Sequence, residues 1–237
     1  MSRVVQDKLP CPLCPSSDAY HIYDDGHGYC FSCNSYVPSK DKQNSSEYTY
    51  EYLPWRGITA DTFRFYGIQT KIDSEGKPVS IGMKYANGDV HVRLVDKKEF
   101  YWVKTGAVSK PGLFGKDKFA AGSHKYVTIT EGALDAASLF QVIKSPVVAV
   151  TSSSSAVGDC ILDHSYLSSF ERIYLSFDSD EAGREAVRGV AKLFDYDKIF
   201  VVKFSNRKDA NEYLQHGEGD ELRNIWWNSK RYLPETI

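Results

Sequence analysis

The sequence contains no long apolar segment. No run of about 18 consecutive apolar residues occurs in its 237 positions, so no membrane-spanning helix is predicted. Its first residues, MSRVVQDKLPCPLC, lack the apolar stretch of a secretory signal, and no internal repeat is present. We therefore expect a cytoplasmic protein without a membrane partner.

An excess of charge of either sign is also missing. The sequence has 29 Lys and Arg against 31 Asp and Glu, which gives a formal net charge of −2. This balance differs from the strongly basic composition of many nucleic-acid-binding domains. Basic residues nevertheless recur between residues 71 and 125, whereas acidic residues gather later in the chain. A polyanion could therefore bind a locally basic face.

Cysteine is rare except at the N-terminus. Four of the five cysteines form two Cys-x-x-Cys pairs, Cys11 with Cys14 and Cys30 with Cys33, separated by 15 residues. Four thiolates from two such pairs form a closed tetrahedral site, which is the arrangement of structural zinc. Two disulfides or an iron–sulfur site are the alternatives, and the spacing and a reducing compartment favour zinc.

The middle of the chain shows short structural signals. Residues 40–51 are polar and predict a flexible linker. In RGITADTFRFYGI, which begins at Arg56, Thr59 is a candidate N-cap of a helix that ends before Gly67. Residues 79–104 are strand-like, with Asn87-Gly88 at a hairpin turn.

From about residue 120 the pattern alternates between strands and helices. The strand-like segments are KYVTIT, PVVAVT, RIYLSF and KIFVVKF, and each precedes a turn or a helical segment. Apolar strands that alternate with helices predict an α/β fold, in which a parallel sheet is covered on both faces. The composition, 42% hydrophobic and 14% aromatic, is sufficient for a buried core.

Acidic and hydroxyl side chains follow these strands. Functional groups in parallel sheets lie just past the carboxyl ends of the strands. This rule places one set of residues at a common edge: Glu131, the turn Ser152–Ser155, Asp178, Asp180 and Asp209. A single acid there is explained as a helix cap, but several together are costly unless a cation neutralises them. Carboxylate oxygens favour magnesium, so the sequence predicts a magnesium site.

Several motifs resemble those of a known family. TITEGALDAAS, which begins at Thr128, resembles the glutamate motif of the Toprim fold of bacterial-type primases, topoisomerases and some nucleases, and SFDSDEAG, from Ser176, resembles its Asp-x-Asp motif. The spaced cysteines, DGHGYC, RGIT, LFGK, TEG, FDSDEAGR and KDANE occur in the same order as in the primase half of T-seven-type phage primase–helicases. The resemblance spans nearly the whole chain.

This resemblance implies a domain organisation. It predicts a small β-rich zinc-ribbon domain at 1–39, a flexible linker at 40–51, an α+β N-terminal subdomain of an RNA polymerase domain at 52–118, and a Toprim subdomain followed by the start of an interdomain linker at 119–237.

The resemblance also implies a function. It predicts a DNA-dependent RNA primase for phage DNA replication, which makes short primers from ribonucleoside triphosphates at a short recognition sequence in single-stranded DNA. Similar proteins continue into a hexameric helicase and work with a replicative DNA polymerase. This sequence has no Gly-x-x-x-x-Gly-Lys-[Ser/Thr] loop, so we expect either a part of a longer protein of this kind, which is the favoured alternative, or a stand-alone primase, acting in the bacterial host cytoplasm.

The resemblance assigns roles to individual residues. Glu131 is the candidate general base or metal-positioning group, and Asp178 and Asp180, supported by Asp209, are expected to bind magnesium. Asp135, one helical turn after Glu131, either shares that face or is a solvated helix acid. Independently of the resemblance, the position of His27 between the cysteine pairs makes it a candidate for contacting unpaired template bases, and packing within the small cysteine domain is the alternative. The residues expected to bind the triphosphate or the template backbone are Arg93, Lys97, Lys98, Lys104 and Lys116.

Two other functions use the same motifs. A zinc-containing Toprim protein can bind DNA in recombination without synthesising primers, and a Toprim nuclease uses the same metal chemistry with water as the nucleophile. The complete acidic set and the basic segment argue against the first. The cysteine domain and the LFGK segment argue against the second.

Overall fold

The computed structural model describes residues 2–39, 48–105 and 110–234, and the chain divides into two compact units. Unit 1 comprises Met1–Tyr52 and Gly67–Pro111, and unit 2 comprises Leu53–Tyr66 and Gly112–Ile237. Most of the predicted linker at 40–51 lies outside the described residues. Its last residues are not free, however, because Thr49–Glu51 form strand β5, which pairs with β6 (Ile68–Ile72).

The first part of unit 1 is a small antiparallel ribbon. Its strands are β1 (Val4–Leu9), β2 (Tyr20–Tyr23), β3 (Gly28–Cys30) and β4 (Ser35–Val37), each paired with the next. The ribbon is too small for a large apolar core, and its buried cluster is built around Cys11, Tyr20 and Cys30. The predicted β-rich cysteine domain is therefore present.

The second part of unit 1 is an antiparallel meander. Strand β6 pairs with β7 (Pro78–Lys84), β7 with β8 (Val90–Leu94), and β8 with β9 (Phe100–Val103). The predicted hairpin is confirmed, since Gly88 adopts a φ of 90° between β7 and β8. One parallel pair, Ser35 with Trp102, joins β4 to β9.

Unit 2 is built on a five-stranded sheet. Its order is β11 (Val147–Ala149), β10 (Tyr126–Thr130), β12 (Arg172–Ser176), β13 (Ile199–Val201) and β14 (Lys230–Arg231). The first four strands are parallel, and β14 adds antiparallel to β13. The carboxyl ends of β10, β11, β12 and β13 therefore share one edge, as the alternating sequence predicts.

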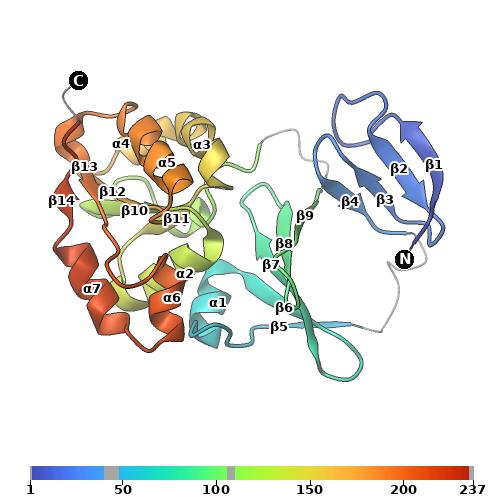
Figure 1. Ribbon diagram of the computed structural model, residues 1–237, viewed down its shortest axis with the longest axis horizontal. Coiled ribbons are helices and arrows are strands. Elements are labelled where there is room, and N and C mark those ends of the chain that lie inside the picture. Colours follow the sequence, from blue (N-terminus) through green and yellow to red (C-terminus); the bar gives the residue numbers. More distant parts are fainter. Residues whose placement is uncertain (1, 40–47, 106–109, 235–237) are drawn as a thin grey trace. The chain divides into compact units, whose positions relative to one another are not determined.

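Helices cover both faces of this sheet (Figure 1). Helices α2 (Ala133–Ile143), α6 (Ala210–Gln215) and α7 (Gly219–Trp227) gather on one face, and α3 (Ala156–Leu162), α4 (His164–Ser168) and α5 (Glu181–Ala191) on the other. Short 3-10 turns occur at Lys116–Lys118, Ser153–Ser155 and Tyr196–Lys198. The predicted α/β architecture is confirmed.

Helix α1 (Ala60–Tyr66) precedes the sheet in sequence and packs against α2. The predicted N-cap is present, because Thr59 Oγ1 accepts a hydrogen bond from the amide of Thr62 at 3.3 Å. Phe63 and Tyr66 are fully buried, and the Tyr66 hydroxyl donates to the carbonyl of Val147 at 2.7 Å. This bond fixes α1 to strand β11.

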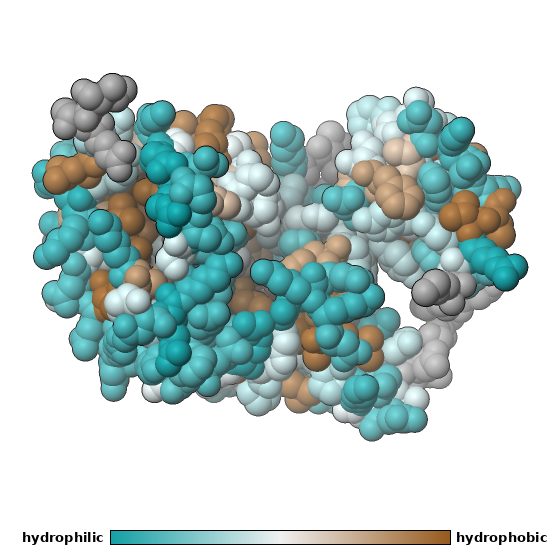
Figure 2. Space-filling model, viewed as in Figure 1, coloured by the Kyte–Doolittle hydropathy of each residue, from teal (hydrophilic) through white to brown (hydrophobic). Residues whose placement is uncertain are grey.

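None of the described helices is long and apolar enough to span a bilayer. Figure 2 shows polar side chains over most of the visible surface, with small hydrophobic patches between them.

Candidate active site and cysteine metal centre

The four N-terminal cysteines converge on one point. The Sγ atoms of Cys11 and Cys33 lie 3.8 Å apart, as do those of Cys14 and Cys30, and all four lie within 4.8 Å of one another. Metal–sulfur bonds of about 2.3 Å in a tetrahedron place the sulfurs about 3.8 Å apart, so the cluster has the dimensions of a four-thiolate metal site. The cysteines are free thiols, which disagrees with the disulfide alternative.

Burial and local hydrogen bonds shift the pKa values of these thiols. Burial raises the pKa of the Cys11 thiol. Burial also acts on Cys30, but the amides of Cys33 and Ser32 donate to its sulfur and lower its pKa to about 7. Closely packed thiolates repel one another, so a bound cation favours the fully ionised cluster.

His27 lies in an aromatic stack within the ribbon. Its ring stacks on Tyr23 at 4.3 Å and on Tyr36 at 5.1 Å between centroids, and its Nδ1 contacts the carboxylate of Asp25. Only 15% of the His27 side chain is exposed. Phe31, by contrast, is 58% exposed. The ribbon thus has an exposed aromatic ring, Phe31, which lies edge-on to His21 at 4.9 Å between centroids, and a separate histidine, His27, that is held in place.

The predicted acids lie at the carboxyl edge of the unit 2 sheet. Glu131 follows β10, and Asp178 follows β12 by two residues. Asp180 caps α5, accepting from the amide of Gly183 at 3.0 Å, and Asp209 caps α6, accepting from the amide of Glu212 at 2.8 Å. The capping explanation is therefore correct for Asp180 and Asp209, but it does not account for Glu131 and Asp178.

These acids are close enough to perturb one another. Burial raises the pKa of Glu131, and the charge of Asp178 raises it further. Burial also raises the pKa of Asp178, and the negative charges of Asp209 and Asp180 act in the same direction. Among the described residues, only the four cysteines, whose sulfurs lie within 4.8 Å of one another, bring three or more ligand atoms together as a metal ion requires, so the acids of this edge do not form such a group by themselves.

Asp135 belongs to this acidic group and is not a solvated helix acid. Burial raises its pKa well above the ordinary value, and the charges of Asp209, Asp178 and Glu131 act in the same direction. Its Oδ1 accepts a hydrogen bond from the amide of Asn211 at 3.0 Å. Asp135 thereby joins α2 to the start of α6.

Asn211 connects the RGIT and KDANE motifs. Its Oδ1 accepts from Arg56 Nε at 2.6 Å, and its Nδ2 donates to the Arg56 carbonyl at 3.1 Å and to Ser138 Oγ at 2.9 Å. Next to Arg56, Gly57 has a φ of 79°, and a Cβ there would lie 2.6 Å from the Leu214 carbonyl. Motifs 155 residues apart thus form one contact that fixes α6 and its cap, Asp209.

Lys208 lies between the paired aspartates. Its Nζ is 3.0 Å from Asp178 Oδ2 and 3.2 Å from Asp180 Oδ2. These contacts, led by the hydrogen bond to Asp178, raise the pKa of Lys208. The sequence includes Lys208 in the KDANE motif but gives no signal of this role, which depends on the pairing of β12 with β13.

The donor set fits a magnesium ion. Asp178 and Asp180 offer oxygen ligands, and a cation, the Lys208 ammonium, already lies between them. Glu131 Oε2 is buried and has no hydrogen-bond partner among the described residues. A buried carboxylate oxygen without a partner is costly, and a metal ion or a hydroxyl would satisfy it.

Two of the basic residues predicted to bind phosphate make internal ion pairs. Lys104 lies 3.0 Å from Asp89, a carboxylate that is 3% exposed, and also lies over the ring of Trp102. Lys116 lies 2.5 Å from Asp163, which also accepts from the amide of Leu113 at 2.8 Å. Both lysines therefore stabilise the fold of their own units, and their predicted phosphate contacts stay predictions.

The other predicted basic residues lie in the β8–β9 hairpin of unit 1. Arg93 is 8% exposed on β8, with its guanidinium 5.9 Å from the centre of the Phe100 ring. Lys97 and Lys98 are exposed in the connecting turn, where Lys97 pairs with Glu99 at 2.8 Å. Exposed pairs of this kind are weak, and the phosphate contacts of these three residues stay predictions.

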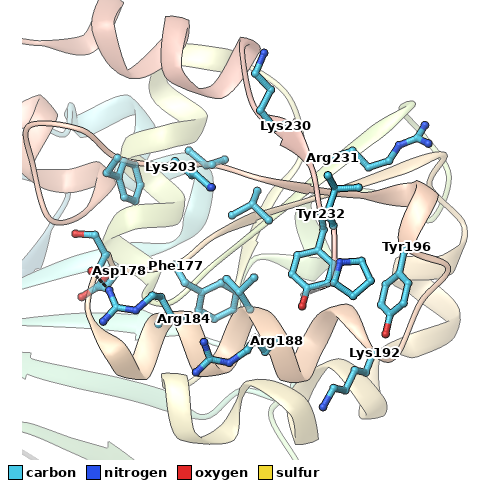
Figure 3. Close-up of a pocket in the computed structure, with 18 residues that line it drawn as sticks. Phe177, Asp178, Arg184, Arg188, Lys192, Tyr196, Lys203, Lys230, Arg231 and Tyr232 are labelled. Atoms are coloured by element: carbon cyan, nitrogen blue, oxygen red, sulfur yellow. Dashed lines mark hydrogen bonds between the residues drawn. The ribbon is translucent and has the colours of Figure 1, made fainter. Parts of the chain in front are cut away.

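A pocket of about 820 Å³ adjoins Asp178. Figure 3 shows Arg184 and Arg188 along α5 and Lys192 just after its last residue, with Asp178 at one end of the pocket and Tyr196 at the other. Spacing of four residues places these cations on one helix face, although Glu181 forms ion pairs with both arginines. Sequence reasoning missed this row, for which the i, i+4, i+8 spacing was the available signal.

Comparisons with known proteins agree with this arrangement. Residues 128–214, which contain the acidic set, match a family described as Toprim-like. The chain is 29% identical over 255 residues to a DNA helicase/primase of Enterobacteria phage T3. The match covers 96% of this chain and 44% of the T3 protein, so the chain spans less than half the length of that relative.

Solved structures give the same result. The primase fragment of the bacteriophage T7 primase-helicase has a TM-score of 0.65 and 29% identity, covering 92% of this chain and 98% of the fragment. Primase domains in a T7 structure with the lagging-strand DNA polymerase and an RNA/DNA hybrid have a TM-score of 0.64 and 28% identity, covering 78% of this chain and 94% of that one. The resemblance to the primase half of T-seven-type phage primase–helicases is therefore confirmed.

Proposed function

We propose that this chain is a DNA primase that synthesises short RNA primers on single-stranded DNA by magnesium-dependent nucleotidyl transfer. The observation that carries the proposal is the convergence of Glu131, Asp178, Asp180 and Asp209 at one sheet edge. The same chain contains a cluster of four cysteines with the dimensions of a metal site, and its likeness to the T7 primase fragment covers 98% of that fragment.

The chemistry assigned to this edge joins the primer 3′-hydroxyl to the α-phosphorus of an incoming ribonucleotide, with pyrophosphate as the leaving group. Asp178 and Asp180 would hold magnesium, which supplies positive charge to the reacting phosphates. Glu131 is suited to accept the hydroxyl proton or to orient a metal ligand, because burial raises its pKa above that of an ordinary carboxylate. Asp209 supports the pair from the cap of α6.

The pocket beside Asp178 is the proposed position of the triphosphate. Arg184, Arg188 and Lys192 give one wall a positive charge, and the pocket extends from the acidic edge along α5. Arginine and lysine side chains that bind a triphosphate also stabilise charge on the departing pyrophosphate. Arg184 and Arg188 would exchange part of their contact with Glu181 for phosphate.

The cysteine domain is proposed to bind zinc and to read the template. Its four sulfurs leave no vacant ligand position, so zinc would act structurally. The exposed ring of Phe31 offers a stacking surface to an unpaired base, and the ordered ring of His27 offers hydrogen-bonding atoms. Arg93, Lys97 and Lys98 are proposed to contact the phosphate backbone of the template or the triphosphate.

The proposed partners follow from the relatives. The T3 relative is a helicase/primase, and we propose that this chain works with a hexameric helicase domain C-terminal to it. The T7 primase domains occur with a lagging-strand DNA polymerase, and we propose a replicative polymerase as a second partner. Such a protein would act in the cytoplasm of the bacterial host.

A direct test is to incubate the chain with four ribonucleoside triphosphates, magnesium and a random pool of single-stranded DNA. Short oligoribonucleotides with a common start sequence are the expected products, and sequencing identifies the recognition site. Asp178→Ala should abolish them while the circular dichroism spectrum stays unchanged. Template degradation without synthesis would instead indicate a nuclease, and DNA binding without either product would indicate a recombination protein.

A further inference from the structure

Lys208 places a positive charge where the proposed magnesium site has its paired carboxylates. The ammonium contacts Oδ2 of Asp178 and Oδ2 of Asp180 at nearly equal distances, 3.0 Å and 3.2 Å. It therefore bridges the two acids rather than pairing with one. Without it, two carboxylates one residue apart in sequence would repel each other.

The main chain of Lys208 is fixed independently of its side chain. Its carbonyl accepts from the amide of Ser179, the residue between the two aspartates, at 3.1 Å. Its own amide donates to Glu212 Oε2 at 2.9 Å. The backbone of Lys208 therefore stays in place beside the aspartates, and the side chain can move away from them without any change in the main chain.

The Lys208 side chain is also free to move outward. It is 43% exposed, whereas the Asp178 side chain is 15% exposed. A flexible lysine at a partly solvated position can return to water at modest cost, because exposed ion pairs contribute about 1 kcal/mol or less each. The arrangement therefore suits a cation that can be displaced.

We propose that Lys208 is an exchangeable counter-ion, which neutralises Asp178 and Asp180 when no metal is bound and must be displaced when a divalent cation binds them. The inference rests on the metal-binding part of the proposed function. It deepens that function by identifying a residue that limits the metal affinity of the site and stabilises the empty site.

The counter-ion role predicts the direction in which removal of Lys208 changes the metal affinity. A cation that competes with the metal weakens metal binding, so its removal should strengthen it. Displacing two partly exposed ion pairs accounts for about a tenfold change in the dissociation constant. If Lys208 instead assisted metal binding, or only supported the loop, its removal would not increase the metal affinity.

The test is a titration with Mn²⁺, followed by the electron paramagnetic resonance signal of the free ion, in the absence of DNA and nucleotides. Lys208→Met should bind Mn²⁺ about tenfold more tightly than the wild-type chain. In a buffer without chelator and without added divalent cations, the same variant should unfold at a lower temperature than the wild type, because the two aspartates then repel each other. Saturating Mn²⁺ should remove that difference.

Two further variants serve as controls. Lys125→Met makes the same charge change at an exposed position before β10, at the opposite edge of the sheet, and should leave the Mn²⁺ affinity unchanged. Lys208→Arg keeps the cation and should keep the affinity within about twofold of the wild type, since the ion pairs persist.

The outcomes separate the two proposals. Equal or weaker Mn²⁺ binding by Lys208→Met, relative to Lys125→Met, would overturn the counter-ion role, as would an equal gain for Lys208→Arg. A wild-type chain that binds Mn²⁺ but makes no primers would refute the primase and leave the counter-ion role intact. A wild-type chain that binds no Mn²⁺ at the acidic edge would overturn both.

Discussion

Asn211 offers the sharpest test of how the acidic edge is held in place. Its side chain is 3% exposed and makes four hydrogen bonds. Its Oδ1 accepts from Arg56 Nε at 2.6 Å and from Gln215 Nε2 at 3.1 Å, and its Nδ2 donates to the Arg56 carbonyl and to Ser138 Oγ. Replacement by alanine removes all four bonds together.

The loss of these four hydrogen bonds sets the expected decrease in the free energy of unfolding. The bond to the guanidinium contributes about 1.5–3 kcal/mol, and each neutral bond contributes about 1 kcal/mol. Water can rescue part of this loss at the partly exposed Arg56 and Gln215, but not at the buried Ser138. We expect Asn211→Ala to lower the free energy of unfolding by about 3 kcal/mol, and the unfolding temperature by roughly 6–12 °C.

Urea denaturation followed by circular dichroism measures this loss. Asn224→Ala is a matched control, because Asn224 is exposed on α7, and its stability should change by less than about 0.5 kcal/mol. A loss below about 1 kcal/mol for Asn211→Ala would show that the connection between the RGIT and KDANE motifs does not stabilise the fold, and the reasoning would be wrong.

Three further outcomes are expected. Cys30→Ser should lose its zinc, measured by elemental analysis, and its template-dependent initiation, because three thiolates no longer close the tetrahedron; retention of one zinc per chain would contradict the assignment. Burial and the charge of Lys104 lower the pKa of His91 to about 4. The free energy of unfolding should therefore fall as the pH drops from about 6.5 toward 4, by at most about 3 kcal/mol. The variant His91→Asn should show a weaker dependence on pH in urea denaturation. The affinity for single-stranded DNA, measured by fluorescence anisotropy, should fall steeply with salt and less steeply in a Lys97→Gln/Lys98→Gln variant; identical salt slopes would exclude these lysines from phosphate contact.

Local signals in the sequence predicted much of the fold. The helix after Thr59, the hairpin at Asn87-Gly88 and the alternation of strands and helices after residue 120 are all present. Each signal lies within a few neighbouring residues, where cap geometry, turn conformation and apolar periodicity act directly. The edge that carries Glu131 and Asp178 followed from topology, since parallel strands end on the same side.

The rest depended on contacts between distant residues. From the sequence, Lys104 and Lys116 are predicted to bind phosphate, but the fold brings each of them to a buried aspartate, Asp89 and Asp163 respectively. Similarly, Lys208 meets Asp178 only because β12 pairs with β13. A single sequence shows the charge of a residue but not the partner that tertiary structure assigns to it.

The short strand β14 has a consequence for solubility. The β13 strand is paired with β12 on one side, and β14 occupies its other side. Without that cover, the open backbone groups of β13 could recruit a strand from another copy of the chain. A two-residue strand of exposed Lys230 and Arg231 is a poor template for such recruitment, because it is short and its positive charges repel an identical neighbour. The edge of the sheet at β13 is thus a poor site for pairing between chains.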